Sequence, residues 1–108
     1  MNDAHSYYLD ELVNNIHRLP FDKDIHYVFR EPNIYRLNHN IVSMCDLIIG
    51  FYDGTASAVE LKGNRVKKPK AIKQINNGRW FIQEVLNKKY NNGLFVVYKH
   101  GDYLFEII

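Results

Sequence analysis

Two consecutive β-type segments joined by an Asp-Gly turn constrain this chain more than any other feature. Residues 41–52 (IVSMCDLIIGFY) and 55–62 (TASAVELK) are rich in apolar, β-branched and aromatic side chains, which are typical of strands. Asp53-Gly54 between them is a strong hairpin signal. The chain is therefore expected to build a sheet around this pair, and the remaining segments must cover it.

The register of this hairpin depends on the length of its loop. A two-residue loop at Asp53-Gly54 places Asp46 opposite Leu61, on the other face from Glu60. A three-residue loop over residues 52–54 ends on a glycine that can adopt the left-handed conformation, and it places Asp46 directly opposite Glu60. We favour the second loop, which predicts Cβ atoms of the two acids about 4.5–5.5 Å apart.

The flanking segments predict helices and further strands. Apolar side chains at helical spacing predict a first helix, capped by Ser6, and a second helix that begins at Pro69 and ends at Asn91-Asn92-Gly93. Gly78 lies on the apolar face of the second helix and would allow close packing. The expected segments are the helix 5–18, the strands 25–30 and 34–38, the helix from 69, and the strands 94–98 and 103–108.

These segments predict one α/β domain over residues 1–108, with a central mixed β-sheet flanked by helices in the order αβββαββ. The 108 residues, of which 46% are hydrophobic, suffice for one core. Cys45 has no partner for a disulfide within the chain, which favours a reducing compartment. No signal peptide or membrane-spanning run is visible. We expect a cytoplasmic protein, or one of the host cytoplasm if the source is a virus, with no membrane partner.

Three charged residues carry the strongest chemical signal. Glu60 and Lys62 alternate with core residues and therefore share one face of a strand, on which Asp46 also lies in the favoured register. Two adjacent carboxylates repel each other unless a hard cation such as Mg²⁺ or a lysine compensates. A divalent cation beside a lysine is suited to phosphodiester hydrolysis. The alternative, equally weighted on spacing alone, is a structural ion pair between Glu60 and Lys62.

Basic residues are concentrated after this strand. Residues 62–83 hold seven of the fourteen Lys and Arg residues and no acid, which favours a surface for backbone phosphates. The alternative is a solvated helix face. The sequence lacks a glycine-rich phosphate loop of the GxxxxGK[ST] type, so no nucleotide cofactor is expected. The candidate phosphate contacts are Arg65, Lys67, Lys68, Lys70 and Lys73.

The histidines and the cysteine offer no competing site. No pair of the five histidines has metal-ligand spacing, and His5 lies on the apolar stripe of the first helix, where packing is its expected role. Nothing in the sequence supports a nucleophilic role for Cys45 with a histidine.

The pattern of Asp46, thirteen residues, then Glu60-Leu61-Lys62, with a helix before and after it, resembles the PD-(D/E)XK nuclease superfamily. Gln74 matches the glutamine that many members carry on the second helix, whereas Cys45 stands where the name of the family has proline. The resemblance covers nearly the whole chain and implies a restriction-endonuclease-like core.

By this resemblance, Asp46 and Glu60 would hold Mg²⁺, or Mn²⁺ in its place, together with the backbone carbonyl of Leu61. Lys62 would orient or activate the attacking water, and Gln74 would support the site from the second helix.

Some relatives, including archaeal Holliday junction resolvases, add a glutamate from the first helix. Glu11 is the candidate here and Asp10 a weaker one. The resemblance thus implies a metal-dependent endodeoxyribonuclease, structure-specific for branched DNA such as Holliday junctions, and a homodimer, because two symmetric cuts need two sites. The alternatives are a nicking or repair nuclease of the same fold and a non-catalytic nucleic-acid-binding module.

Overall fold

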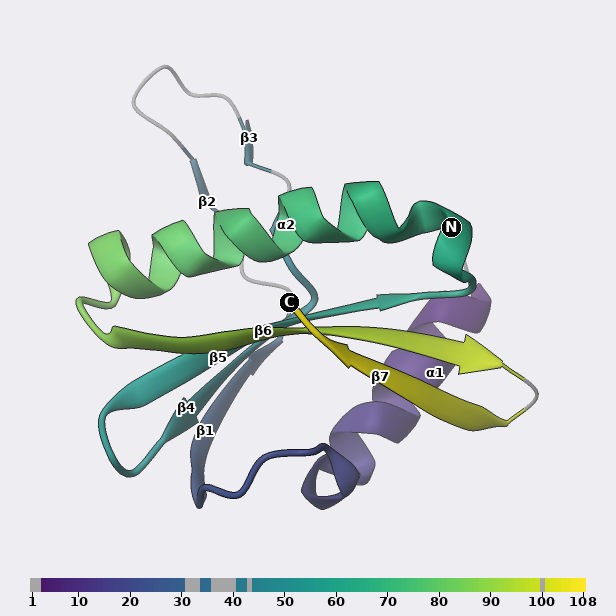
Figure 1. Ribbon diagram of the computed structural model, residues 1–108, viewed down its shortest axis with the longest axis horizontal. Coiled ribbons are helices and arrows are strands. Elements are labelled where there is room, and N and C mark those ends of the chain that lie inside the picture. Colours follow the sequence, from purple (N-terminus) through teal and green to yellow (C-terminus); the bar gives the residue numbers. More distant parts are fainter. Residues whose placement is uncertain (1–2, 31–33, 36–40, 43, 100) are drawn as a thin grey trace.

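A five-stranded mixed sheet forms the centre of the fold, in the spatial order β1-β4-β5-β6-β7 (Figure 1). The computed structural model describes residues 3–30, 34–35, 41–42, 44–99 and 101–108. Neighbouring strands of this sheet are antiparallel except β5 and β6, which are parallel. The elements are α1 (Asp3–Asn14), β1 (Ile25–Arg30), β2 (Ile34–Tyr35), β3 (Ile41–Val42), β4 (Leu47–Phe51), β5 (Thr55–Lys62), α2 (Lys68–Trp80), β6 (Lys89–Lys99) and β7 (Asp102–Ile107), with 3₁₀ turns at Ile16–Arg18 and Arg65–Lys67 and a π-helical turn at Phe81–Val85.

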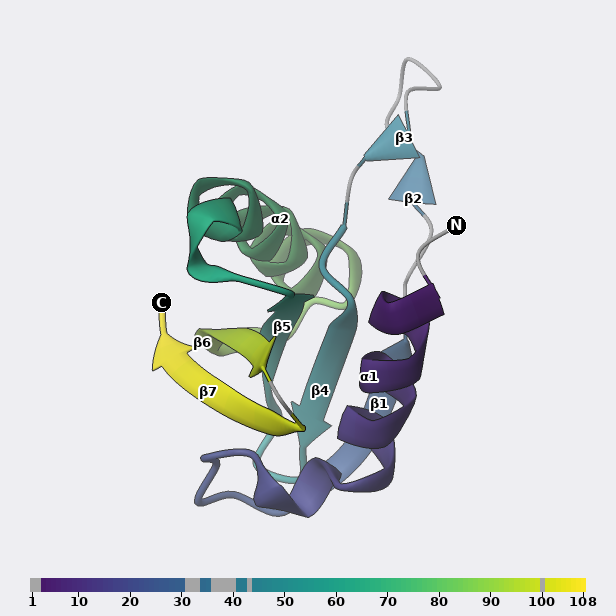
Figure 2. The ribbon, with the colours of Figure 1, turned by 90° about the vertical axis from the view of Figure 1, so that its right-hand side faces the viewer.

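The two helices lie on opposite faces of the sheet, as Figure 2 shows edge-on. Alternate strand residues divide between two apolar clusters, as the pleat of a sheet requires. The cluster under α1 contains Leu9, Leu12, Leu47, Ile49, Val59, Leu61, Leu94 and Val96. The cluster under α2 contains Cys45, Ile48, Ala56, Ala58, Ala71, Ile75, Phe95 and Val97. The prediction of a mixed sheet flanked by helices is therefore confirmed.

The β4–β5 hairpin has the three-residue loop. Leu47 pairs with Val59 and Gly50 with Ala56, which is the register that this loop predicts. The N–H of Gly54 donates to the carbonyl of Phe51 at 3.1 Å, and Gly54 has a φ of +88°, where a side chain would be strained. The continuation of this register brings Asp46 opposite Glu60.

The boundary between α2 and β6 differs from the prediction. Asn91-Asn92-Gly93 does not end the helix but lies inside β6, and the chain turns earlier, where Asn87 has a φ of +54°. Both asparagine side chains are satisfied within the sheet, because each forms a 2.9 Å hydrogen bond with the hydroxyl of Ser57 on β5. A Cβ at Gly93 would lie 2.4 Å from a methyl of Ile75, so this glycine allows α2 to approach.

Two smaller predictions also need correction. Ser6 lies inside α1, which begins at Asp3, and so it is not the N-cap. The predicted strand 41–52 is divided into β3 and β4, because residues 44–46 leave the extended path and the N–H of Asp46 bonds a side chain instead of a neighbouring strand. Of the predicted strand 34–38, β2 covers Ile34–Tyr35 and residues 36–38 lie outside the described residues.

Gly78 is the point at which α2 comes closest to the sheet. A Cβ added there would lie 2.6 Å from Cys45 Sγ and 2.8 Å from Ala58 Cβ. Both distances are shorter than side chains tolerate, and Ala58 Cβ is fixed directly to the backbone of β5. The prediction that this glycine allows close packing is thus confirmed.

We expect Gly78→Ala to destabilise the protein by about 1–3 kcal/mol, the usual cost of overpacking a core, despite the better helix propensity of alanine. Denaturant unfolding measures this loss. The exposed Asn76→Ala on the same helix is the matched control and should leave stability unchanged or slightly improved. Equal stability of both variants would contradict the close packing of α2.

Candidate functional site

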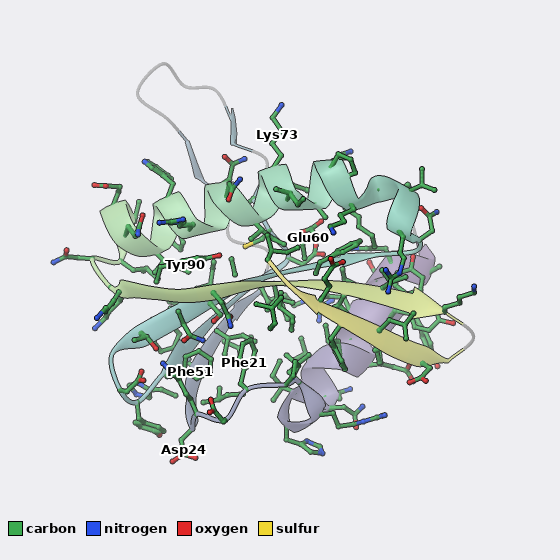
Figure 3. The ribbon with its side chains drawn as sticks, in the orientation of Figure 1. Phe21, Asp24, Phe51, Glu60, Lys73 and Tyr90 are labelled. Carbon is green, nitrogen blue, oxygen red and sulfur yellow. The ribbon has the colours of Figure 1, made fainter. Side chains whose placement is uncertain are left out.

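Asp46, Glu60 and Lys62 meet where β4 begins and β5 ends. Asp46 immediately precedes β4, whereas Glu60 and Lys62 are among the last three residues of β5. Asp46 is 8% exposed and Glu60 only 1% exposed. Figure 3 shows Glu60 between the sheet and α2. Ionised groups at this depth are costly unless neighbouring groups compensate them.

The two acids are held by reciprocal bonds across the hairpin. The N–H of Asp46 donates to Glu60 Oε1 at 2.9 Å. The N–H of Leu61 donates to Asp46 Oδ2 at 2.8 Å. Each carboxylate is therefore fixed by the backbone of the opposite segment, which sets their relative orientation without a ligand.

Lys62 completes the predicted trio. Its Nζ lies 2.9 Å from Glu60 Oε2, and its side chain is 13% exposed. Both interpretations of the sequence, a hydrolytic site and a structural ion pair, predict this contact. The trio thus contains two acids and one ammonium group, so it carries an excess of negative charge when both acids are ionised.

His5 joins this group from α1, which the sequence interpretation missed. Its Nε2 lies 3.2 Å from Asp46 Oδ2, and its side chain is 25% exposed. His5 precedes the buried Leu9 by one helical turn, so the apolar stripe that predicts packing also points this residue toward the sheet. The available signal was the position of a polar residue at the end of that stripe.

The pKa shifts in the site report the same excess of negative charge. Burial and the Asp46 carboxylate raise the pKa of Glu60 to about 8, against the opposing effect of Lys62. The hydrogen bond with Asp46 raises the pKa of His5 above its ordinary 6.5, although burial opposes this. The surroundings of Glu60 and His5 therefore stabilise an additional positive charge, which could be a bound proton or a cation.

The donor set fits a hard divalent cation that keeps part of its water. In the described ranges, no three His, Cys, Asp or Glu side chains are placed to enclose a metal ion by themselves. Mg²⁺ commonly binds through one or two carboxylates, with waters and substrate phosphates as its other ligands. Asp46, Glu60 and the backbone carbonyl of Leu61 could supply such a partial set.

Glu11 and Asp10 do not join the trio. Glu11 Oε1 accepts a hydrogen bond from the hydroxyl of Tyr7 at 3.3 Å, and Asp10 forms an ion pair with Arg30. Glu11 follows His5 by six residues, about 9 Å along a helix. The structure therefore brings His5, and not the predicted Glu11, from α1 to Asp46.

Gln74 lies on α2 near the segment that leads into Asp46. Its Nε2 donates to the carbonyl of Met44 at 3.5 Å. This contact joins α2 to the backbone two residues before Asp46. It places Gln74 beside the segment that leads into the trio.

The predicted phosphate contacts have different surroundings. Lys68 Nζ lies 2.5 Å from Glu106 Oε1 on β7, so this lysine joins α2 to the edge of the sheet. Lys73 projects from the side of α2 that faces away from the sheet (Figure 3). The exposed members of the set are Arg65, Lys67, Lys70 and Lys73.

Comparisons with protein-family models, with curated proteins and with solved structures found no match for this chain. Within the described residues, every helix is too short or too polar to span a lipid bilayer.

The raised pKa of Glu60 predicts how stability depends on pH in the presence of a chelator. Because the folded protein holds this proton more tightly than the unfolded chain, stability should fall as pH rises from about 4.5 to above about 8. Glu60→Gln should flatten this decline in denaturant titrations, whereas the exposed Glu84→Gln should retain it. Adding Mn²⁺ at high pH should stabilise the wild type and not Glu60→Gln. An unchanged slope in Glu60→Gln would contradict the assignment.

The contact of His5 predicts a second pH effect. A raised histidine pKa adds stability that is fully present below about pH 6.5 and is lost as pH rises through the folded value. His5→Gln should therefore cost about 1 kcal/mol at low pH and progressively less at high pH. Unfolding measured at both pH values tests this, with the exposed His17→Gln as control. A cost for His5→Gln that is independent of pH would contradict the pairing with Asp46.

Proposed function

We propose that this chain is a metal-dependent endodeoxyribonuclease with the restriction-endonuclease-like core of the PD-(D/E)XK superfamily. The observation that carries the proposal is the convergence of Asp46, Glu60 and Lys62 at one end of the β4–β5 hairpin. The element order supports it, because the five-stranded sheet receives a helix, three strands, a helix and two strands in chain order.

Each residue of the site has a role in this proposal. A divalent cation, when bound, would supply Lewis-acid stabilisation of a phosphodiester and acidify a water. Asp46 and Glu60 would hold that cation with the carbonyl of Leu61. Lys62 would orient the attacking water, and its partial burial keeps its side chain directed at Glu60. His5 would position the Asp46 carboxylate through its ring nitrogen.

DNA is the proposed substrate, because the exposed cations after β5 suit backbone phosphates and do not by themselves read bases. Structure-specific cleavage of branched DNA, such as a Holliday junction, by a homodimer remains our leading subclass. It rests on the resemblance to small resolvases. A nicking or repair nuclease of the same fold would use the same site on another DNA form.

A non-catalytic nucleic-acid-binding module is the second candidate. The observation that favours it is the ion pair between Lys62 and Glu60, which gives each of these groups a partner of opposite charge without a metal ion. Under this alternative, the trio would join the end of β5 to the rest of the sheet and would not take part in chemistry. DNA binding would then persist without any cleavage that depends on a divalent cation.

The decisive experiment measures cleavage of four-way, flap and linear DNA in the presence of Mg²⁺ or Mn²⁺. The proposal predicts cation-dependent cleavage by the wild type. Glu60→Gln and Lys62→Ala should each reduce the rate by about 100-fold or more, because one loses cation binding and the other loses orientation of the water.

Glu84→Gln and Lys88→Ala are the matched controls, because both residues are exposed and far from the end of β5. Thermal melts should show that all four variants are folded under the assay conditions. Full cleavage by Glu60→Gln and Lys62→Ala would refute the site. Absence of cleavage by the folded wild type on every DNA form would refute the nuclease proposal.

A further inference from the structure

A groove opens directly beyond Lys62, where the chain leaves β5. Its volume is about 250 Å³, which is small for a ligand pocket and leaves room for a single nucleotide unit at most. It lies between the loop that follows β5, the end of β6 and the neighbouring part of β7. Its lining residues are Gly63, Asn64, Arg65, Val97, Lys99 and Leu104.

The sheet register places this groove beside the candidate site. Lys62 pairs with Val97, and Val97 pairs with Leu104. Cross-strand partners share one face of a sheet, so these three side chains form one row. The preceding row on the same face contains Glu60, which pairs with Phe95. A ligand in the groove would therefore lie one row from Glu60 and next to Lys62.

The lining combines two kinds of chemistry. Arg65 and Lys99 are exposed cations, and the lining contains no acid. Val97 and Leu104 are apolar, and Leu104 is 45% exposed although it belongs to a strand. Asp102 opposes Lys99 in the register, and its carboxylate, which also accepts the N–H of Tyr103 at 2.8 Å, offsets one of these two positive charges. The groove thus retains a net positive charge beside an apolar surface.

We propose that this groove binds the nucleotide that flanks the scissile phosphate of a nucleic-acid strand. Arg65 and Lys99 hold the phosphate of that nucleotide, and its sugar or base covers Val97 and Leu104. The proposal rests on the proposed function, because it takes Lys62 as the neighbour of the reacting phosphate. It assigns a binding role to two residues that the basic stretch does not contain, Lys99 and Leu104.

One lysine of the basic stretch already has an acidic partner at the edge of the sheet. Lys68 is engaged with Glu106 on β7, and neither residue is part of the groove lining. Within the groove, the nucleic-acid strand would have Arg65 and Lys99 as its cationic partners. Substitutions at Arg65 and Lys99 can therefore distinguish binding in the groove from non-specific attraction to the other exposed lysines.

The test is equilibrium binding of a fluorescein-labelled four-way DNA junction and a labelled short single strand, measured by anisotropy in EDTA. Arg65→Ala and Lys99→Ala should each weaken binding by about 3- to 10-fold. Each should also reduce the slope of log K against log salt concentration by about one, because one phosphate contact is lost. Leu104→Ala should weaken binding by a similar factor without changing the salt dependence, because it removes apolar contact area and no charge.

Lys88→Ala and Val85→Ala are the matched controls, since they remove an exposed cation and an exposed apolar side chain away from the groove. Binding by all three groove variants that equals binding by these controls would overturn the proposal, as would a wild type that binds neither DNA.

The same variants distinguish this proposal from the nuclease proposal. If cation-dependent cleavage occurs with an unchanged KM in Arg65→Ala, Lys99→Ala and Leu104→Ala, the groove is wrong and the nuclease stands. If these variants lose binding while the wild type shows no cleavage, the groove stands as a nucleotide-binding site, whereas its place beside a scissile phosphate and the hydrolytic role of the trio are both wrong. Circular dichroism melts confirm that each variant is folded.

Discussion

The register of the β4–β5 hairpin is the constraint on which the rest of the site depends. Because the side chains of a strand alternate, a shift of one residue would send Asp46 to the opposite face from Glu60. The loop ending at Gly54 prevents this shift, since its left-handed conformation suits a three-residue connection. The reciprocal bonds between Asp46, Glu60 and the backbone of Leu61 then follow from the pairing of the two segments.

The buried acids oppose folding, and the surrounding groups offset that cost. Glu60 receives a backbone N–H and the ammonium of Lys62, while Asp46 receives a backbone N–H and the ring of His5. Burial and the neighbouring Asp46 still raise the pKa of Glu60 to about 8, and the hydrogen bond with Asp46 raises the pKa of His5. Apolar side chains would often be at least as stable in such a position, and the proposed hydrolytic role would account for the charged cluster.

Several parts of the fold could be predicted because they depend on local patterns. β1 and β5 have the predicted bounds, since alternating β-branched and apolar residues specify them. The end of α2 could not be predicted in this way. Asn91-Asn92-Gly93 is a typical helix stop, but Ser57 on β5 and Ile75 on α2 give those residues partners in the sheet. Tertiary contacts thus overrode local propensity.

The amino-acid order by itself determined the hairpin, its loop length and therefore the meeting of Asp46, Glu60 and Lys62, because strand periodicity and one left-handed glycine are local properties. Only the tertiary structure decided that His5 reaches Asp46 and that Glu11 does not. The position of α1 over the sheet depends on how its leucines pack against distant strands. No spacing within α1 reports the distance from its first turn to β4.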